Sequence, residues 1–254
     1  MSGDRPRHVE LFGPITASLV QALPEIERRL NRQITVVGGL AVLSRLGSAA
    51  HRVTSDVDTV NRRLGGEPGQ LDVLLTTGAT AIDGAGAMVT TPTGDVRVDV
   101  LEISEEQLND LPTDPTDRLY LLSHDWALRS ATPLHIRAVG GGTTSEHTVR
   151  VAEPGPLIAT KLQALPNRAS VKEATDLLDI VRLVLDAETG SVVRAQLAAA
   201  DVLLKQDAAL HVQRWFGTAV ERSLRLIRTT PSGSDTTPDT VALVGELLLA
   251  SLTG

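Results

Sequence analysis

Two aspartates, Asp56 and Asp58, alternate within a short apolar run and are well suited to bind a metal ion. In a β-strand, residues i and i+2 point to the same face, so the two carboxylates would lie side by side, with Val57 and Val60 turned towards the core. Neighbouring carboxylates repel each other unless a cation lies between them. A divalent ion with oxygen ligands suits the pair, and we expect Mg²⁺, with Mn²⁺ as the alternative. The pair predicts a metal site of the phosphoryl-transfer type.

An Asp-x-Asp pair by itself is weak evidence, because acidic residues make up 31 of the 254 residues and solvated turns often contain such pairs. The preceding segment strengthens the prediction. Residues 34–37 form a β-branched run typical of a buried strand, Gly38 and Gly39 follow, and helical periodicity begins at Leu40. Glycines let the backbone approach a phosphate closely, and a helix N-terminus offers unpaired N–H groups to the anion. A glycine pair is also common in turns without a ligand, so only the two motifs together predict a nucleotide site.

A third carboxylate is expected, because a two-metal site takes ligands from more than one strand. Asp99 is the best candidate, since residues 95–103 alternate as a strand does and place Asp99 on the same face as Arg97 and Leu101. An aspartate among valines and beside Leu101 is not a typical solvated residue. The alternative interpretation is a half-exposed strand position paired with Arg97, and Glu102 is the second candidate for the same role.

The order of these motifs resembles the nucleotidyltransferase superfamily built around DNA polymerase beta. Its elements here are Gly-Gly, then Arg52-x-Thr54-x-Asp56-x-Asp58, then a lone strand aspartate. The Arg-x-Thr-x-Asp-x-Asp form is similar to the AbiEii toxins of bacterial abortive-infection systems and to the related MenT toxins. The resemblance implies that Gly38, Gly39, Arg52 and Thr54 bind the nucleotide, and that Asp56, Asp58 and Asp99 are catalytic metal ligands.

A downstream block supports the narrower resemblance. Lys161-Leu-x-Ala-Leu, Arg168 and then Lys172-Glu-Ala-Thr-Asp176-Leu are similar to the family's Lys-Leu-x-Ala-Leu and Asp-x-x-Asp-Leu signature, although Glu173 stands where an aspartate is common. The resemblance implies that Lys161 contacts the triphosphate as a catalytic and nucleotide-binding residue. It implies that Asp176 is catalytic, positioning Lys161 or a base. The alternatives are a surface lysine and an aspartate on a solvated helix face.

The resemblance also implies a biological role. The protein would be a Mg²⁺-dependent toxin of a type IV-like toxin–antitoxin system, moving NMP from an NTP to RNA, most plausibly the 3′ end of tRNA, and a cognate antitoxin would neutralise it. Two alternatives remain open. One is a small-molecule nucleotidyltransferase of the antibiotic-resistance type, favoured by an acidic acceptor pocket. The other is a non-catalytic nucleotide-binding regulatory module.

Composition limits the class of protein. With 42% hydrophobic residues and a mean hydropathy of +0.04, the chain is typical of a globular protein. The absence of cysteine excludes disulfides and thiolate metal sites and suits the cytosol. No apolar run is long enough to span a bilayer. A net charge of −7 argues against unspecific nucleic-acid binding over the whole surface. We expect a cytoplasmic monomer without a membrane partner.

The pattern of elements predicts two domains. Residues 1–150 are expected to form an α/β (α+β) nucleotidyltransferase core with a mixed sheet and an N-terminal helix over residues 14–31. Residues 151–254 are expected to form a mainly helical domain. A hairpin is predicted for residues 87–91 and 96–103, joined by a turn at residues 93–95. Two further strands are predicted at residues 133–138 and 147–151, on either side of the glycines at 140–142. Residues 70–82 fit a helix and a strand equally well.

Overall fold

The computed structural model describes residues 6–46 and 52–254. They form two compact units: a sheet unit of residues 6–44, 53–109 and 125–153, and a helical unit of residues 45–46, 52, 110–124 and 154–254. Residues 1–5 and 47–51 of the predicted first domain lie outside the described residues. The fold is thus of the mixed α/β type, as the sequence predicts.

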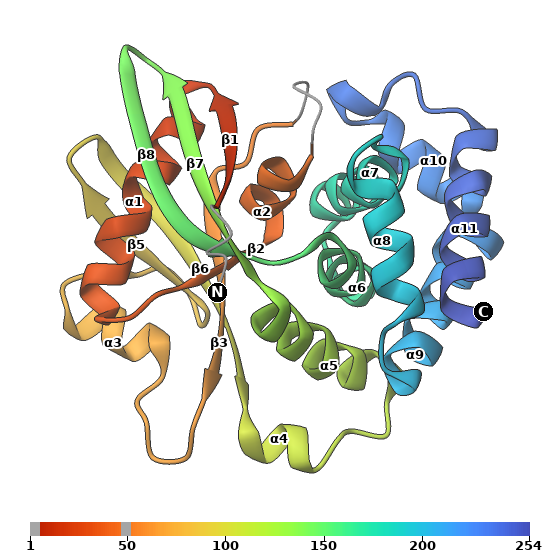
Figure 1. The fold of residues 1–254 in the computed structure, drawn as a ribbon, viewed down its shortest axis with the longest axis horizontal. Helices are drawn as coiled ribbons and strands as arrows, with labels where there is room; N and C mark the ends of the chain where they lie inside the picture. Colours follow the sequence, from red (N-terminus) through yellow and green to blue (C-terminus); the bar gives the residue numbers. More distant parts are fainter. Residues whose placement is uncertain (1–5, 47–51) are drawn as a thin grey trace. The chain divides into compact units, whose positions relative to one another are not determined.

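The sheet unit is built on a mixed sheet, in which the described residues contribute eight strands in the order β1-β7-β8-β2-β3-β6-β5-β4 (Figure 1). Neighbours pair in parallel at β1–β7, β8–β2 and β3–β6 and antiparallel elsewhere. The strands are β1 (Arg7–Phe12), β2 (Thr35–Val37), β3 (Asp56–Arg63), β4 (Thr80–Ala81), β5 (Gly86–Thr91), β6 (Gly94–Ser104), β7 (Thr132–Gly140) and β8 (Thr143–Val151).

The longest helix of the sheet unit follows from apolar periodicity. Helix α1 (Pro14–Leu30) buries Leu19, Leu23 and Ile26 at helical spacing and packs on β7 and β8. The shorter helices are α2 (Gly38–Arg45), α3 (Gln70–Thr76) and α4 (Glu105–Asn109). The N-terminal helix is therefore confirmed, and it begins and ends within one residue of the predicted bounds.

Local patterns predicted most strands but not all. The predicted hairpin is confirmed as β5–β6, because its alternating runs flank a short glycine-containing turn. The two strands predicted around the glycines at 140–142 are confirmed as β7 and β8, which pair with each other as a second hairpin. The ambiguous residues 70–82 contain helix α3 and the two-residue strand β4. Strand β1 is missing from the prediction, since its single buried position, Leu11, gives no alternating signal. Val57 and Val60 are both buried, but alternation places Val60 on the face of Asp58, so its predicted orientation was wrong.

The helical unit contains a succession of helices. They are α6 (Pro154–Ala164), α7 (Ser170–Leu185), α8 (Thr189–Ala198), α9 (Val202–Val212), α10 (Val220–Arg228) and α11 (Pro238–Thr253), with a π-helical turn at Gln213–Thr218. Helix α5 (Pro115–Ser130) begins in the helical unit and ends in the sheet unit. Within residues 6–46 and 52–254, no helix has the length and apolar character needed to cross a membrane.

A buried histidine in α5 predicts a pH-dependent stability. His124 is 3% exposed, and its Nδ1 lies 2.6 Å from the carbonyl oxygen of Tyr120, so Nδ1–H donates and the ring is neutral. Burial lowers the pKa of His124 to about 4; the Tyr120 carbonyl opposes this shift and the Arg168 guanidinium adds to it. Between the ordinary pKa of 6.5 and this value, the unfolded chain binds a proton that the folded chain does not.

The free energy of unfolding should therefore fall by about 3 kcal/mol from this residue as the pH drops from about 6.5 to 4, and stay unaffected above pH 6.5. Urea unfolding of the wild type and of His124→Asn between pH 7.5 and 4.5 measures this change in the free energy of unfolding. The asparagine can still donate to Tyr120 but does not titrate. Identical pH dependence of the two proteins would contradict the prediction.

Candidate metal centre

The predicted acidic residues meet where two central strands run in parallel. Asp58 on β3 lies opposite Asp99 on β6, and on its other side it faces Val37 at the end of β2. Asp56 lies two residues before Asp58 and therefore shares its face. Each of the three aspartates offers one carboxylate oxygen, and these oxygens lie within 4.8 Å of one another. The structure thus brings together Asp56, Asp58 and Asp99, which we call the acidic triad.

Gly38 lies directly against Asp58. Its φ of +64° is in the left-handed region that favours glycine, and a Cβ there would be 1.9 Å from Oδ2 and 2.4 Å from Cγ of Asp58. Only a residue without a side chain can therefore occupy the β2–α2 junction while Asp58 keeps this orientation. Gly39, the second predicted glycine, lies in the first turn of α2. Gly38 thus helps to shape the acidic triad, in addition to the predicted role of the glycine pair beside a phosphate.

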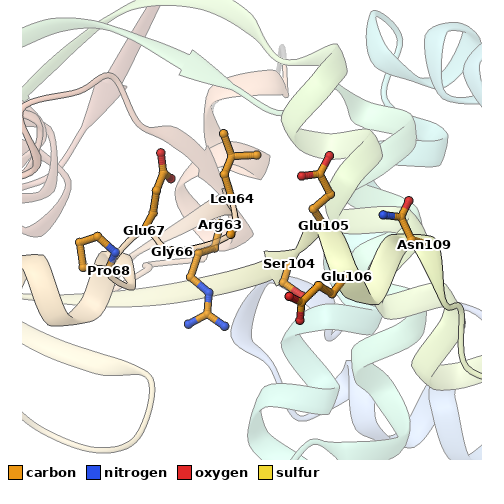
Figure 2. A pocket seen from close by; sticks show the side chains of 10 residues that line it. Arg63, Leu64, Gly66, Glu67, Pro68, Ser104, Glu105, Glu106 and Asn109 are labelled. Atoms are coloured by element: carbon orange, nitrogen blue, oxygen red, sulfur yellow. The ribbon is translucent and has the colours of Figure 1, made fainter.

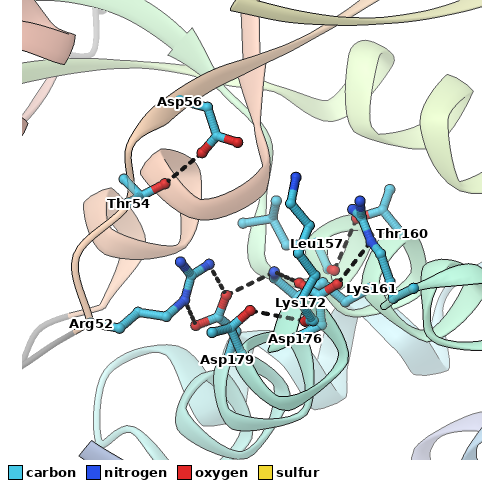
Figure 3. A network of polar contacts seen from close by, with 11 residues as sticks. Arg52, Thr54, Asp56, Leu157, Thr160, Lys161, Lys172, Asp176 and Asp179 are labelled. Carbon is cyan, nitrogen blue, oxygen red and sulfur yellow. Dashed lines mark hydrogen bonds and ion pairs between the residues drawn. The ribbon is translucent and has the colours of Figure 1, made fainter. Parts of the chain in front are cut away.

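Thr54 orients the first aspartate of the triad. Its side chain is buried, and its hydroxyl donates a hydrogen bond of 3.1 Å to Oδ1 of Asp56 (Figure 3). Since a carboxylate with one oxygen engaged keeps the lone pairs of the other, the contact is compatible with metal binding by Asp56. The predicted nucleotide-binding residue Thr54 is therefore a neighbour of the acidic triad.

Arg97 and Asp83 accompany the third aspartate. Nε of Arg97 lies 2.8 Å from Oδ1 of Asp99, and Nη2 of Arg97 lies 2.8 Å from Oδ2 of Asp83. Hydrogen bonds from Arg97, first to Asp99 and then to Asp83, raise the pKa of Arg97 above its ordinary value. On β5, opposite Asp99, stands Gly86, where a Cβ would come within 2.8 Å of Asp99 Oδ1. The alternative interpretation of Asp99, a strand aspartate paired with Arg97, is therefore also observed.

Glu102, the second candidate for the third carboxylate, has other partners. Its Oε2 accepts hydrogen bonds from the backbone N–H of Gln70 at 2.8 Å and from the side chain of Asn61 at 3.3 Å, and Arg63 lies 3.5 Å from its Oε1. Alternation along β6 places it on the face opposite Asp99. Among the described residues, the acidic group around Asp58 that could hold a metal ion includes Asp99 and not Glu102.

The donor set of the triad fits Mg²⁺. All three groups offer hard carboxylate oxygens, which Mg²⁺ and Mn²⁺ prefer. Two oxygens on opposite sides of a Mg²⁺ ion bound at 2.0–2.1 Å are about 4 Å apart, so small side-chain rotations close the observed spacing of up to 4.8 Å. Half-buried carboxylates this close also repel one another, which favours a cation between them.

The downstream predicted residues form a buried ion cluster in the helical unit (Figure 3). Lys161 on α6 is 5% exposed, and its Nζ lies 2.6 Å from Oδ1 of Asp176 and 2.8 Å from Oδ2 of Asp179, both on α7. Arg52 bonds both oxygens of Asp179, through Nε at 2.9 Å and Nη2 at 2.7 Å. The interpretations of Lys161 as a surface lysine and of Asp176 as a solvated residue are therefore wrong, because both are buried and paired with each other.

The buried pair Lys161–Asp179 stabilises the charged form of both side chains. Burial by itself lowers the pKa of Lys161, but the carboxylates of Asp176 and Asp179 outweigh it and raise the pKa above its ordinary value. Burial likewise raises the pKa of Asp179, while Lys161 and Arg52 outweigh it and lower the pKa. Nε of Arg168 lies 3.2 Å from Oδ2 of Asp176, an ion-pair distance without hydrogen-bond geometry. Lys161 and Asp179 are thus both charged at neutral pH.

Predicted site residues therefore belong to two groups. Gly38, Gly39, Thr54 and the triad belong to the sheet unit, and Lys161, Asp176 and Arg52 belong to the helical unit. Sequence reasoning missed Asp179, Asp83 and Gly86. Asp179 carried a weak signal, since it lies three residues after Asp176 on the same helix face. Asp83 and Gly86 carried none, because their proximity to Asp99 depends on the pairing of β5 with β6.

A pocket of about 600 Å³ also lies in the sheet unit (Figure 2). It is lined by residues 63–68 and by Ser104, Glu105, Glu106 and Asn109. Glu67, Glu105 and Glu106 make it acidic, as the small-molecule alternative requires of an acceptor pocket. However, the pair Arg63–Ser104 lies five residues along β3 and β6 from the pair Asp58–Asp99. At 3.3 Å per residue, the pocket is about 17 Å from the acidic triad, too far to hold the acceptor of a reaction there.

The observations that characterise the acidic triad are its geometry and the motifs of the sequence. In comparisons with protein-family models, with curated proteins and with solved structures, no match to this chain was found.

Proposed function

We propose that this protein is a Mg²⁺-dependent nucleotidyltransferase that moves NMP from an NTP to a hydroxyl of an RNA acceptor. The observation that carries the proposal is the acidic triad, whose three carboxylate oxygens lie within 4.8 Å on two adjacent parallel strands. Three carboxylates whose oxygens converge on one sheet face suit metal-assisted phosphoryl transfer. The mixed sheet that carries the triad is the proposed nucleotidyltransferase core.

Asp56, Asp58 and Asp99 would hold the metal ions. When bound, the ions supply charge neutralisation at the triphosphate and lower the pKa of the acceptor hydroxyl. Asp99 takes the hydroxyl proton, the acceptor oxygen forms a bond to the α-phosphorus, and the bond from that phosphorus to the pyrophosphate oxygen breaks. Gly38, Gly39 and the N-terminal turn of α2 offer backbone N–H groups to the phosphates.

The roles proposed for the helical unit rest on the family resemblance. Lys161 would stabilise negative charge on the triphosphate, and its raised pKa supports a permanently charged lysine. Asp176 is proposed to position Lys161, which the Nζ–Oδ1 distance of 2.6 Å supports. Arg52 is proposed to assist nucleotide binding, and its guanidinium is oriented by both oxygens of Asp179.

The acceptor and the biological role are also proposed from the resemblance to the AbiEii and MenT toxins. The acceptor would be the 3′ end of tRNA, and its modification would stop growth until a cognate antitoxin neutralises the enzyme. The distance of about 17 Å between the acidic pocket and the triad speaks against that pocket as a drug-acceptor site. The proposed toxin is a cytoplasmic monomer.

The test is transfer of labelled NMP. Purified wild type, Asp58→Asn and Asp95→Asn are each incubated with total bacterial tRNA, Mg²⁺ and one α-³²P-labelled NTP at a time. Asparagine keeps the shape of Asp58 beside Gly38 but removes a metal ligand, so we expect at least a 100-fold loss of labelling. Asp95→Asn is the matched control, because Asp95 is an exposed carboxylate on the same strand as Asp99.

The nucleotide that labels tRNA identifies the substrate in the same experiment. Labelling that is equal in wild type and Asp58→Asn would disprove the proposed site. If tRNA stays unlabelled with all four nucleotides, the tRNA proposal fails, and labelled aminoglycoside acceptors then test the small-molecule alternative.

A further inference from the structure

Arg97 contacts the acidic triad through Asp99, and the proposed mechanism gives it no role. It lies on β6 opposite Asp56 on β3, two residues before Asp99, and therefore on the face of all three carboxylates. Its Nε–H donates to Oδ1 of Asp99 at 2.8 Å. One oxygen of the third metal ligand is thus already engaged by a guanidinium.

Asp83 holds the other side of this guanidinium. Nη2 of Arg97 donates to Oδ2 of Asp83 at 2.8 Å, and Oδ1 of Asp83 accepts a hydrogen bond from the backbone N–H of Ala85 at 3.1 Å. The planar fork of arginine can bond two carboxylates at once in fixed directions, which the ammonium of lysine cannot. Arg97 is therefore held between a loop carboxylate and a proposed metal ligand.

Gly86 makes room for this arrangement. A Cβ at Gly86 would lie 2.8 Å from Oδ1 of Asp99, 3.0 Å from Oδ1 of Asp83 and 3.1 Å from Nη2 of Arg97. All three groups thus pack on the bare backbone of β5, and the pairing of Gly86 with Asp99 fixes their level in the sheet. Because three charged groups pack against one glycine, their arrangement is more restricted than that of an ordinary surface ion pair.

We propose that Arg97 is a positioning residue that, anchored by Asp83, occupies Oδ1 of Asp99 and leaves the other oxygen of Asp99 to bind the metal ion. The inference rests on the proposed function and deepens it. A carboxylate held at one oxygen ligates through one oxygen, whereas a free carboxylate also chelates a metal through two. Arg97 has a second effect, because its positive charge competes with the metal for Asp99.

These two effects predict opposite changes in metal affinity and in turnover. Without Arg97, Asp99 is free to chelate, so the metal ion should bind more tightly but in the wrong geometry. A side chain with a purely structural role would, when removed, weaken both or change neither. Tighter metal binding combined with slower turnover is therefore the signature of positioning.

The experiment measures Mn²⁺ binding by electron paramagnetic resonance without nucleotide, and kcat and KM for the NTP with tRNA as acceptor. For Arg97→Gln we expect Mn²⁺ to bind about threefold more tightly, with kcat about tenfold lower and KM for the NTP within about twofold of wild type. Arg137→Gln is the matched control, since Arg137 pairs with Glu10 on the same sheet at an exposed position.

Two further variants separate charge from geometry. Arg97→Lys keeps the charge but loses the fork, so Mn²⁺ affinity should stay near wild type while kcat remains about tenfold lower. Asp83→Asn removes a negative charge, so that Asp99 becomes the one carboxylate paired with Arg97 in this arrangement. Mn²⁺ should then bind about twofold more weakly. The Asp83 side chain is 48% exposed, so this variant tests the inference even if Arg97→Gln does not fold.

Arg97→Gln with wild-type Mn²⁺ affinity and wild-type kcat would overturn the inference, as would full turnover in Arg97→Lys. An Asp83→Asn variant with unchanged Mn²⁺ affinity would also overturn it. Failure of the proposed function has a different outcome: the wild type transfers no NMP. In that case the Mn²⁺ measurements still test whether Arg97 controls metal binding at the acidic triad. Asp58→Asn should weaken Mn²⁺ binding, and Arg97→Gln should strengthen it.

Discussion

Gly38→Ala is expected to reduce the proposed nucleotidyl transfer at least about 100-fold, because it displaces Asp58, a proposed metal ligand, by roughly 1 Å or more. The new Cβ would lie 1.9 Å from Oδ2, 2.4 Å from Cγ and 2.8 Å from Cβ of Asp58. Since the clash includes Cβ and Cγ, rotation of the carboxylate alone does not relieve it. Either Asp58 changes its χ1 rotamer and leaves the triad, or β2 and β3 separate. Both responses remove Asp58 from the metal centre.

Backbone strain must be separated from this displacement. The φ of +64° at Gly38 costs an alanine about 1–2 kcal/mol of stability, whatever its side chain meets. Gly142→Ala is the matched control, because Gly142 has a φ of +78° and nothing within 4 Å of its hypothetical Cβ. Both variants should lose similar stability from strain, but only Gly38→Ala should lose Mn²⁺ binding.

Urea unfolding, Mn²⁺ titration and the transfer assay together measure these effects. Wild-type Mn²⁺ affinity in a folded Gly38→Ala protein would show that Asp58 does not need its observed orientation. Equal loss of transfer in Gly38→Ala and Gly142→Ala would show that strain, and not the contact with Asp58, is responsible.

Asp179→Asn is expected to lower the free energy of unfolding by about 3–5 kcal/mol, the range for breaking a buried ion pair by removing one partner. Asp179 is 4% exposed and bonds Arg52 through both oxygens and Lys161 through Oδ2. An asparagine has one acceptor oxygen. Whichever way its amide is turned, the NH₂ group faces a donor of Arg52 or Lys161.

Because of the charge balance of the cluster, we expect the loss of Asp179 to lower the free energy of unfolding more than the loss of Lys161. The cluster contains three cations, Arg52, Lys161 and Arg168, and two carboxylates, Asp176 and Asp179. Removal of Asp179 leaves three cations with one carboxylate. Removal of Lys161 leaves two of each, with one arginine beside each carboxylate, so it should be tolerated better.

Lys161→Met is therefore the matched comparison, and we expect it to lower the free energy of unfolding by about 1.5–3 kcal/mol, the value of lost hydrogen bonds to charged groups. Its effect on transfer should be the larger one if the lysine contacts the triphosphate, about 100-fold. Urea unfolding followed by circular dichroism ranks the two variants. An Asp179→Asn protein as stable as Lys161→Met would contradict this account of the cluster.

Local patterns in the sequence predicted the elements that carry the candidate site. Alternation with period two places Asp56 and Asp58 on one face, whatever the strand pairs with. A glycine-containing turn between alternating runs predicted the β5–β6 hairpin, similar runs predicted strands β7 and β8, and apolar spacing predicted α1. Such features depend on neighbours within a few residues, so they can be recognised from the chain alone.

Strand β1 and the ion cluster could not be predicted from local patterns, because both depend on contacts between segments that are distant in the chain. Strand β1 is held by parallel pairing with β7, more than a hundred residues later in the chain. The cluster joins Arg52 to Asp179 across a sequence separation of 127. The motifs of Lys161 and Asp176 suggested a role by resemblance, but nothing in their helical spacing showed that both are buried.

The sequence by itself determined which carboxylates can bind a metal ion and that Asp99 occupies a strand, because these follow from residue type and alternation. Only the tertiary structure decided that Asp58 lies opposite Asp99, that Gly38 and Gly86 pack on these two carboxylates, and that Arg97 and Asp83 accompany Asp99. The physical reason is that a strand's side-chain alternation is set locally. The register between strands is set by hydrogen bonds and packing among segments that are distant in the chain.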